Sequence, residues 1–350
     1  MSQPWLFSRS TDLWVFGAPA LVSLLLVAAG LAHGDALGDL PAGLWLLTVL
    51  AVDVSHVWST IFRTYADGDE VRRRPLLYLG TPLLAYAAGV ALHLAGGAAL
   101  FWRVLAYGAV FHFVRQQYGW VRLYRRRGGE RDRLGSWLDG ATIYAATLVP
   151  LLIWHARLPR KFHWFVEGDF ASGLSPRVVP VACALYAALL SAYLGRALLT
   201  RSTAWGKHLL VGSTALCWWL GIVSFDSDFI FSVTNVLIHG VPYFALIWRY
   251  GRGRWAGQPG TVAGIFRLGW GAFYALLVAV AFLEEGAWDG LVWHEHAQFF
   301  GDTGLELGPL ALALLVPLLA VPQAVHYLLD GFIWRVGPDN PGLAERLDLR

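Results

Sequence analysis

The sequence predicts an all-helical fold: a polytopic membrane bundle of about ten transmembrane helices with both termini in the cytoplasm. Hydrophobic residues make up 57% of the 350-residue chain and charged residues only 15%, whereas about a quarter of an ordinary soluble domain is charged. The mean hydropathy is +0.51. Arginine-rich connections alternate with short or acidic ones, as the positive-inside rule requires. No polar stretch is long enough to form a separate soluble domain, so residues 1–350 are expected to form a single transmembrane domain.

A helix of about 20 apolar residues spans the hydrocarbon core of a bilayer, and ten segments approach that length. They cover residues 12–32, 41–63, 75–95, 98–122, 136–155, 177–199, 207–225, 228–249, 263–283 and 307–334. The connections after the even-numbered segments hold most of the arginines, including six between residues 122 and 133. This bias predicts a multi-pass protein of a bacterial-type inner membrane.

Local signals place the boundaries in chain order. The first segment is an uninterrupted apolar run, and the second ends at the "IFR" sequence of residues 61–63. Only two glycines separate the third segment from the fourth, and "FDSD" separates the seventh from the eighth. A long acidic connection, residues 284–306, precedes the tenth segment. The connection of residues 156–177 departs from the charge pattern because it carries four basic residues on the expected outer side.

Composition also excludes several classes of function. The net charge of +3 comes from arginines in the connections, so nucleic acid is not expected as a partner. Cys183 and Cys217 lie in different apolar segments, which excludes a disulfide framework and a C-x-x-C motif. The only methionine is the initiator, so a methionine-rich copper(I) site is absent.

Four histidines lie inside even-numbered segments, all of which run from the outside to the inside of the membrane. They are His56, His112, His239 and His326, and each precedes the arginine at the inner boundary by seven to ten residues. At 1.5 Å per residue, the four imidazoles are expected roughly 10–15 Å above that boundary. The shared depth predicts that they meet in the cytoplasmic half of the bilayer.

Each of these histidines has polar neighbours three or four residues away, which is the spacing of adjacent side chains on one helical face. Asp53 accompanies His56, Arg115 and Gln116 accompany His112, Asn235 accompanies His239, and Gln323 and Asp330 accompany His326. A metal-bound imidazole usually donates its second N–H to such a group. Gln116, Asn235 and Gln323 are therefore expected to support the ligands.

A metal ion explains why such an apolar chain keeps ionisable groups in its interior. Unpaired charged groups inside a bilayer cost several kcal/mol and usually mark functional sites. Nitrogen and oxygen ligands without sulfur suit iron, zinc or manganese. We expect His56, His112, His239 and His326 as ligands, and Asp53, Arg115 and Asp330 as catalytic groups. The structural alternative is that Asp53 or Asp330 pairs with Arg115 and simply holds two helices together.

The remaining histidines are expected to be structural or neutral, except those of the "WHEH" sequence. His294 and His296 lie in the acidic outer connection, where an exposed cation site or a lid is possible. Aromatic residues near the four central histidines, namely Trp58, Tyr118, Tyr243, Trp248 and Tyr327, are expected to line a pocket or to pack between helices.

The favoured function is a membrane metalloenzyme that uses iron to hydroxylate, desaturate or cleave a lipid or isoprenoid substrate, with an electron-transfer partner. In general plan this resembles the histidine-rich membrane desaturases and hydroxylases, although their H-x-x-x-H and H-x-x-H-H clusters do not occur here. Three alternatives stay open. They are a zinc-dependent lipid hydrolase similar in principle to the intramembrane ceramidases, with Ser55 or Ser59 assisting; a bis-histidine haem electron carrier; and a proton or metal transporter.

Overall fold

The computed structural model describes residues 4–34 and 38–349, and every regular element in this part of the chain is a helix. In chain order the elements are α1 (Arg9–Asp12), η1 (Leu13–Gly17), α2 (Ala18–His33), α3 (Ala42–Trp45), η3 (Leu46–Val54), α4 (Ser55–Ser59), η4 (Thr60–Arg63), α5 (Gly68–Arg73), α6 (Pro75–Arg127), α7 (Arg133–His155), α8 (Val178–Leu199), α9 (Trp205–Trp218), η5 (Trp219–Ser224), α10 (Asp228–Phe231), η6 (Ser232–Val236), α11 (Leu237–Trp255), α12 (Thr261–Leu268), α13 (Trp270–Trp288), η7 (Asp289–Trp293), α14 (Ala297–Phe300), α15 (Pro309–Leu319), α16 (Val321–Ile333) and α17 (Leu343–Arg346).

Seven continuous helices in the described ranges are long and apolar enough to cross a membrane. They are Arg9–His33, Ala42–Arg63, Pro75–Arg127, Arg133–His155, Val178–Leu199, Asp228–Trp255 and Pro309–Ile333. An eighth is obtained if the bent pair Thr261–Leu268 and Trp270–Trp293 counts as one span. These helices are consistent with a multi-pass membrane protein. They support the predicted helical membrane bundle but not the count of ten spans.

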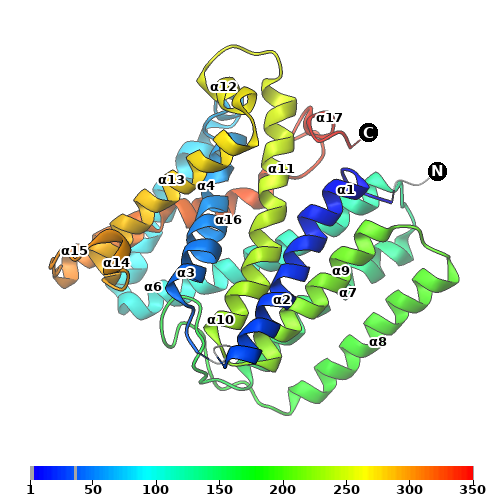
Figure 1. Ribbon diagram of the computed structural model, residues 1–350, viewed down its shortest axis with the longest axis horizontal. Coiled ribbons are helices and arrows are strands. Elements are labelled where there is room, and N and C mark those ends of the chain that lie inside the picture. The colour runs from blue at the N-terminus through cyan, green and yellow to red at the C-terminus, as the bar shows by residue number, and fades with distance from the viewer. Residues whose placement is uncertain (1–3, 35–37, 350) are drawn as a thin grey trace.

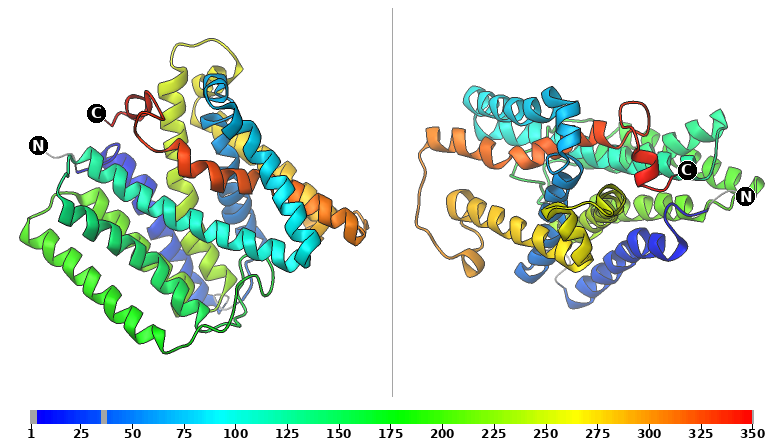
Figure 2. Two further views of the ribbon diagram at one scale, coloured as in Figure 1. Left: turned by 180° about the vertical axis from the view of Figure 1, so that it is seen from behind. Right: turned by 90° about the horizontal axis from the view of Figure 1, so that it is seen from above.

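Helix α6 accounts for part of the difference in count. It contains the predicted segments 75–95 and 98–122 as two arms, joined at Gly97, where the backbone has φ 70° and ψ −173°. This left-handed φ favours glycine, which has no Cβ to clash. Figure 2 shows the resulting V, with α16 between the arms. Tyr78 of the first arm packs against α16, and Tyr327 of α16 stacks on His112 of the second arm.

Two other predicted segments are also built differently from a simple span. The predicted segment 263–283 is broken at Gly269 (φ 104°), where α12 and α13 meet at 118°. The predicted segment 207–225 corresponds to α9 followed by the π-helical stretch η5.

The arginine-rich end of the bundle is the end that contains Arg63, the last turns of α6, and residues 249–254 of α11. Both chain ends lie near it (Figure 1). Buried ion pairs hold this end together. Asp139 of α7 contacts Arg125 at 2.6 Å and Lys207 at 2.8 Å, and all three side chains are at most 3% exposed. Removing one member of such a network would leave the others buried and uncompensated.

Glu70 of α5 forms a second clamp at this end. Burial alone would raise the pKa of Glu70, but Arg63, Arg73 and Arg74 together lower it to about 2. The carboxylate pairs with Arg73 at 2.5 Å and with Arg74 at 2.9 Å. Because this pKa is lower in the folded protein than in the unfolded chain, the clamp is fully stabilising above about pH 4.5 and weakens as the pH falls toward 2.

Five stretches of the described chain are π-helical rather than α-helical, namely η1, η3, η5, η6 and η7. Such wide turns are rare and often occur at functional sites. The stretches η3 and η6 pack against each other. η3 directly precedes the helix that carries His56, and η6 directly precedes the helix that carries His239. They therefore set the rotation of these two side chains about their helix axes.

Candidate metal centre

The structure brings the four predicted histidines together from four separate helices. His56 comes from α4, His112 from the second arm of α6, His239 from α11 and His326 from α16. One ring nitrogen from each lies within 4.8 Å of the corresponding nitrogen of every other. Each side chain is at most 2% exposed. Among the described residues, this buried group is the only set of three or more His, Cys, Asp or Glu side chains that could hold a metal ion.

The hydrogen bonds around these rings leave several nitrogens without a partner. Neither ring nitrogen of His56, nor Nδ1 of His239, nor Nε2 of His326 has a hydrogen-bond partner among the described residues. Buried polar atoms are nearly always satisfied in native proteins, and those that are not call for an explanation such as an ion. A cation at the centre would satisfy nitrogens that face one another here.

The distances fit a first-row metal ion. The Nε2 atoms of His112 and His239 are 3.2 Å apart. With metal–nitrogen bonds of about 2.1 Å, this separation corresponds to an angle of roughly 100° at the ion, which suits tetrahedral and octahedral coordination alike. Two nitrogens bound to one ion at this bond length are at most about 4.2 Å apart, so binding would require the widest pair in the group, within 4.8 Å, to move closer. Zinc, iron and manganese all accept such a nitrogen-rich set.

The same packing argues against a haem between these rings. His112 and His326 have ring centroids 4.3 Å apart, and His56 lies 4.7 Å from His239 and 4.9 Å from His326. A bis-histidine haem needs two imidazoles on opposite faces of a wide porphyrin plane. Neighbouring imidazoles already occupy the space that this plane would need.

A close approach of two helices makes the cluster possible. Gly240 follows His239 in α11, and a Cβ at this position would lie only 2.6 Å from Cγ1 of Val52 in η3. The missing side chain therefore lets α11 pack directly against the helix that carries His56. A larger residue at Gly240 would push these two ligands apart.

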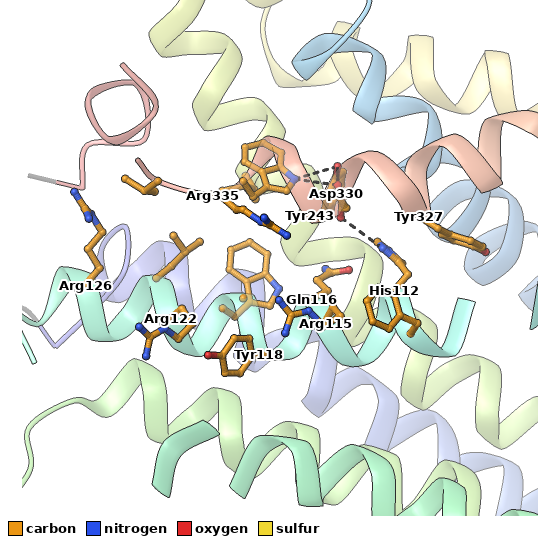
Figure 3. A pocket seen from close by; sticks show the side chains of 18 residues that line it. His112, Arg115, Gln116, Tyr118, Arg122, Arg126, Tyr243, Tyr327, Asp330 and Arg335 are labelled. Carbon is orange, nitrogen blue, oxygen red and sulfur yellow. Dashed lines mark hydrogen bonds and ion pairs between the residues drawn. The ribbon is translucent and has the colours of Figure 1, made fainter. Parts of the chain in front are cut away.

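Asp330 is the predicted carboxylate that lies beside two of the four histidines. Its Oδ2 is 3.6 Å from Nδ1 of His112, and its Oδ1 is 4.0 Å from Nδ1 of His326. Oδ1 accepts hydrogen bonds from the Tyr243 hydroxyl at 2.6 Å and from the Trp334 indole at 3.0 Å (Figure 3). These donors fix the carboxylate beside two imidazoles.

Thr60 also belongs to this network, although it is not among the site residues predicted from the sequence. Its hydroxyl lies 2.7 Å from Nδ1 of His326 and 2.9 Å from the Tyr243 hydroxyl. Because Thr60 contacts Nδ1 of His326, Nε2 is the ring nitrogen that remains free to bind a metal ion. Thr60 follows His56 by four residues, so the spacing used to find the other polar neighbours also indicates this one. Trp334 follows Asp330 by four residues and was overlooked in the same way.

We expect the Asp330→Asn variant to fold normally but to bind metal more weakly. Asparagine keeps an oxygen for Tyr243 and Trp334 but removes the negative charge beside His112 and His326. Groups that orient metal-bound histidines typically contribute 10–100-fold in affinity, and we expect a loss of roughly that size. Competition with a chelator of known affinity measures it. The exposed Asp302→Asn variant is the control, and an affinity within about twofold of wild type would refute this role for Asp330.

Asp53 lies beside the cluster but faces partly outward. Its Oδ1 is 3.6 Å from Nδ1 of His56, and its side chain is 36% exposed. Arg115 does not pair with either carboxylate among the described residues, so the expected structural ion pair is not observed. Instead Arg115 is exposed, donates a hydrogen bond to the Tyr144 hydroxyl and stacks on Tyr118.

The three predicted supporting amides do not contact the imidazoles. Gln116 donates to the backbone oxygen of His239 at 2.8 Å, so it positions the helix rather than the ring. Asn235 instead donates to the Thr234 hydroxyl and to the backbone oxygen of Phe231. Gln323 makes no side-chain hydrogen bond to any histidine within residues 38–349.

The outer histidines and the aromatic residues take varied positions. His296 stacks on Trp45 with centroids 3.9 Å apart, and its Nδ1 is 3.6 Å from Asp289. His294 does not join it in a metal cluster within the described part of the chain. Trp248 packs against Phe266 and Phe273, away from the four histidines.

A cavity of about 320 Å³ begins at the cluster and runs between the second arm of α6 and α16. His112, Gln116, Tyr243, Tyr327 and Asp330 line one end. Figure 3 shows Arg122, Arg126 and Arg335 toward the other end. Its volume lies in the range of small-molecule sites, which is about 300–1,000 Å³. Of the four histidines, His112 is the one that lines this cavity, so a ligand in the cavity would lie beside the cluster.

The several membrane-length helices and the buried four-histidine group, which could hold one metal ion, fit a membrane metalloprotein. Comparison with known proteins does not narrow this class. No protein-family model matches the chain, and neither the curated proteins nor the solved structures include a significant match.

Proposed function

We propose that this protein is an integral-membrane metalloenzyme that binds iron at His56, His112, His239 and His326 and oxidises a lipid or isoprenoid substrate. The observation that carries the proposal is the convergence of four buried ring nitrogens within 4.8 Å. Several of these imidazoles have nitrogens without a partner. Iron held by histidine with open positions can activate O₂.

The position of the cluster supports a lipidic substrate. The four ligands lie on apolar helices, and the adjoining cavity has apolar and aromatic walls that include Phe111, Trp120 and Leu246. A hydrophobic molecule can therefore reach the site from the lipid phase. A hydroxylation would convert R–H, O₂, two electrons and two protons into R–OH and water. The electrons would come from a separate electron-transfer protein.

The residues around the cluster have distinct roles in this proposal. Asp330, oriented by Tyr243 and Trp334, holds a negative charge beside His112 and His326. Thr60 holds His326 with Nδ1 away from the cluster. The tight packing of the rings, together with Gly240, excludes bulk water from the metal. These groups orient the ligands and leave the cavity side open for substrate.

Metal analysis of the purified protein is the direct test. We expect roughly one iron per chain and no strong Soret absorbance near about 410 nm. Inductively coupled plasma mass spectrometry and an absorption spectrum measure both quantities. Zinc in place of iron would favour a lipid hydrolase, in which the ion activates water. A strong Soret band or the absence of any metal would refute the proposal.

A further inference from the structure

The cavity beside the four histidines has an unbalanced charge. Four of the residues that line it are arginines, namely Arg115, Arg122, Arg126 and Arg335, whereas Asp330 is the single carboxylate in its wall. Asp330 lies at the histidine end. The opposite end is therefore strongly positive and has no acidic group of its own.

None of these four arginines has a carboxylate partner within residues 4–34 and 38–349. Arg122 donates to the Ser136 hydroxyl at 2.6 Å, and Arg335 lies over the Phe332 ring. Arg126 makes no hydrogen bond or ion pair with another described side chain. By contrast the adjacent Arg125 contacts three carboxylates. The acidic residues of this end thus pair with other cations and leave the cavity positive.

The rest of the cavity lining is mainly apolar. It includes Phe111, Leu123, Leu246 and Val336 together with the rings of Tyr118, Trp120 and Trp334. Arg122 and Arg126 follow His112 by 10 and 14 residues on the same arm of α6. At 1.5 Å per residue, these positions lie roughly 15 and 21 Å from His112 along the helix. A ligand that contacts both ends must therefore be elongated.

We propose that the cavity binds an elongated amphiphile whose carboxylate or phosphate group contacts Arg122, Arg126 and Arg335, while its apolar part extends toward the four histidines. Guanidinium groups bind both anions with charge-assisted, often bidentate hydrogen bonds. This inference rests on the proposed function, because it names the substrate class of the same site. It also predicts which part of the substrate reacts, namely the part remote from the anionic group.

Binding of three probes that share a chain length tests this inference. Tritiated palmitate, hexadecyl phosphate and hexadecanol are titrated against the full-length protein in a non-ionic detergent. We expect at least one of the two anions to bind roughly ten- to hundredfold more tightly than the uncharged alcohol, the difference that charge-assisted hydrogen bonds provide. A preference for palmitate assigns a carboxylate ligand, and a preference for hexadecyl phosphate assigns a phosphate ligand.

Charge-removing variants locate the anion. Arg126→Gln and Arg335→Gln should each weaken binding of the preferred anion by roughly tenfold without changing the metal content. Arg252→Gln is the matched control, because Arg252 is an exposed arginine at the same end of the bundle but outside the cavity. Equal binding of the alcohol, or an equal loss in the Arg252 variant, would overturn the inference.

The two proposals can fail separately. If the purified wild-type protein contains no metal but still binds the anions, the inference is supported and the proposed oxidase function is refuted. A protein that contains iron but binds the anions no better than hexadecanol retains the metal centre and overturns the inference.

Discussion

Purified protein with His239→Ala is expected to lose essentially all of its bound metal. His239 contacts His112 and His56 directly, and its Nε2 lies 3.2 Å from that of His112. Its removal takes away one of four ligands and opens a space for water. Because changes to groups outside the ligand shell already cost about 10–100-fold in affinity, we expect a loss of at least roughly 100-fold. Metal content per chain after dialysis against a weak chelator measures this loss.

The same substitution at an exposed histidine provides the control. His163→Ala should keep the full metal content, since His163 lies at the surface and outside the cluster. Size-exclusion chromatography should show that both variants are folded and monodisperse. Ala at His56, His112 or His326 should have the same effect as at His239. Stoichiometric metal in three of these four variants would rule out a shared site.

The Asp139→Ala variant is expected to be the least stable of the single substitutions considered. The Asp139 carboxylate accepts from Arg125 at 2.6 Å and from Lys207 at 2.8 Å, and it is 1% exposed. Breaking a buried ion pair by removal of one partner typically costs about 3–5 kcal/mol. We expect the free energy of unfolding in detergent to fall by about this amount, measured by denaturant-induced unfolding.

An exposed aspartate gives the comparison for this effect. Asp69→Ala removes ion pairs with Arg72 and Arg254, and the Asp69 side chain is 68% exposed. Exposed pairs contribute only about 0–1 kcal/mol. If Asp139→Ala were as mild as Asp69→Ala, the buried network would not hold the arginine-rich end together.

The four-histidine cluster was predictable because it depends on quantities that sequence controls directly. Helix direction follows from the position of the arginines, and depth follows from the number of residues to the inner boundary. Together they selected four of the eleven histidines, and the structure brings these four together. Asp330 followed from its spacing to His326. Thr60 has a comparable spacing from His56, but threonine is common where membrane helices pack and does not stand out there as a charged residue does.

Spacing along the helix did not predict what the three amides Gln116, Asn235 and Gln323 bind. A spacing of three or four residues identifies neighbours only where a helix has 3.6 residues per turn. Asn235 satisfies the spacing to His239, but its amide bonds to Thr234 and to the backbone of Phe231 on its own helix. Gln116 satisfies the spacing but bonds to a backbone oxygen of another helix, which depends on how α6 and α11 cross. The count of ten spans is not confirmed: the predicted segments 75–95 and 98–122 form one helix bent at Gly97, and the predicted segment 263–283 is broken at Gly269.

The wide turns before His56 and His239 have a consequence for sequence variation. Loss or gain of one residue within η3 or η6 would rotate every following side chain of that helix by about 100° and turn the imidazole away from its partners. A change of the same size in the connection of residues 156–177 would leave all four rings in place. We therefore expect functional insertions and deletions to fall in the connections and to spare residues 46–54 and 232–236.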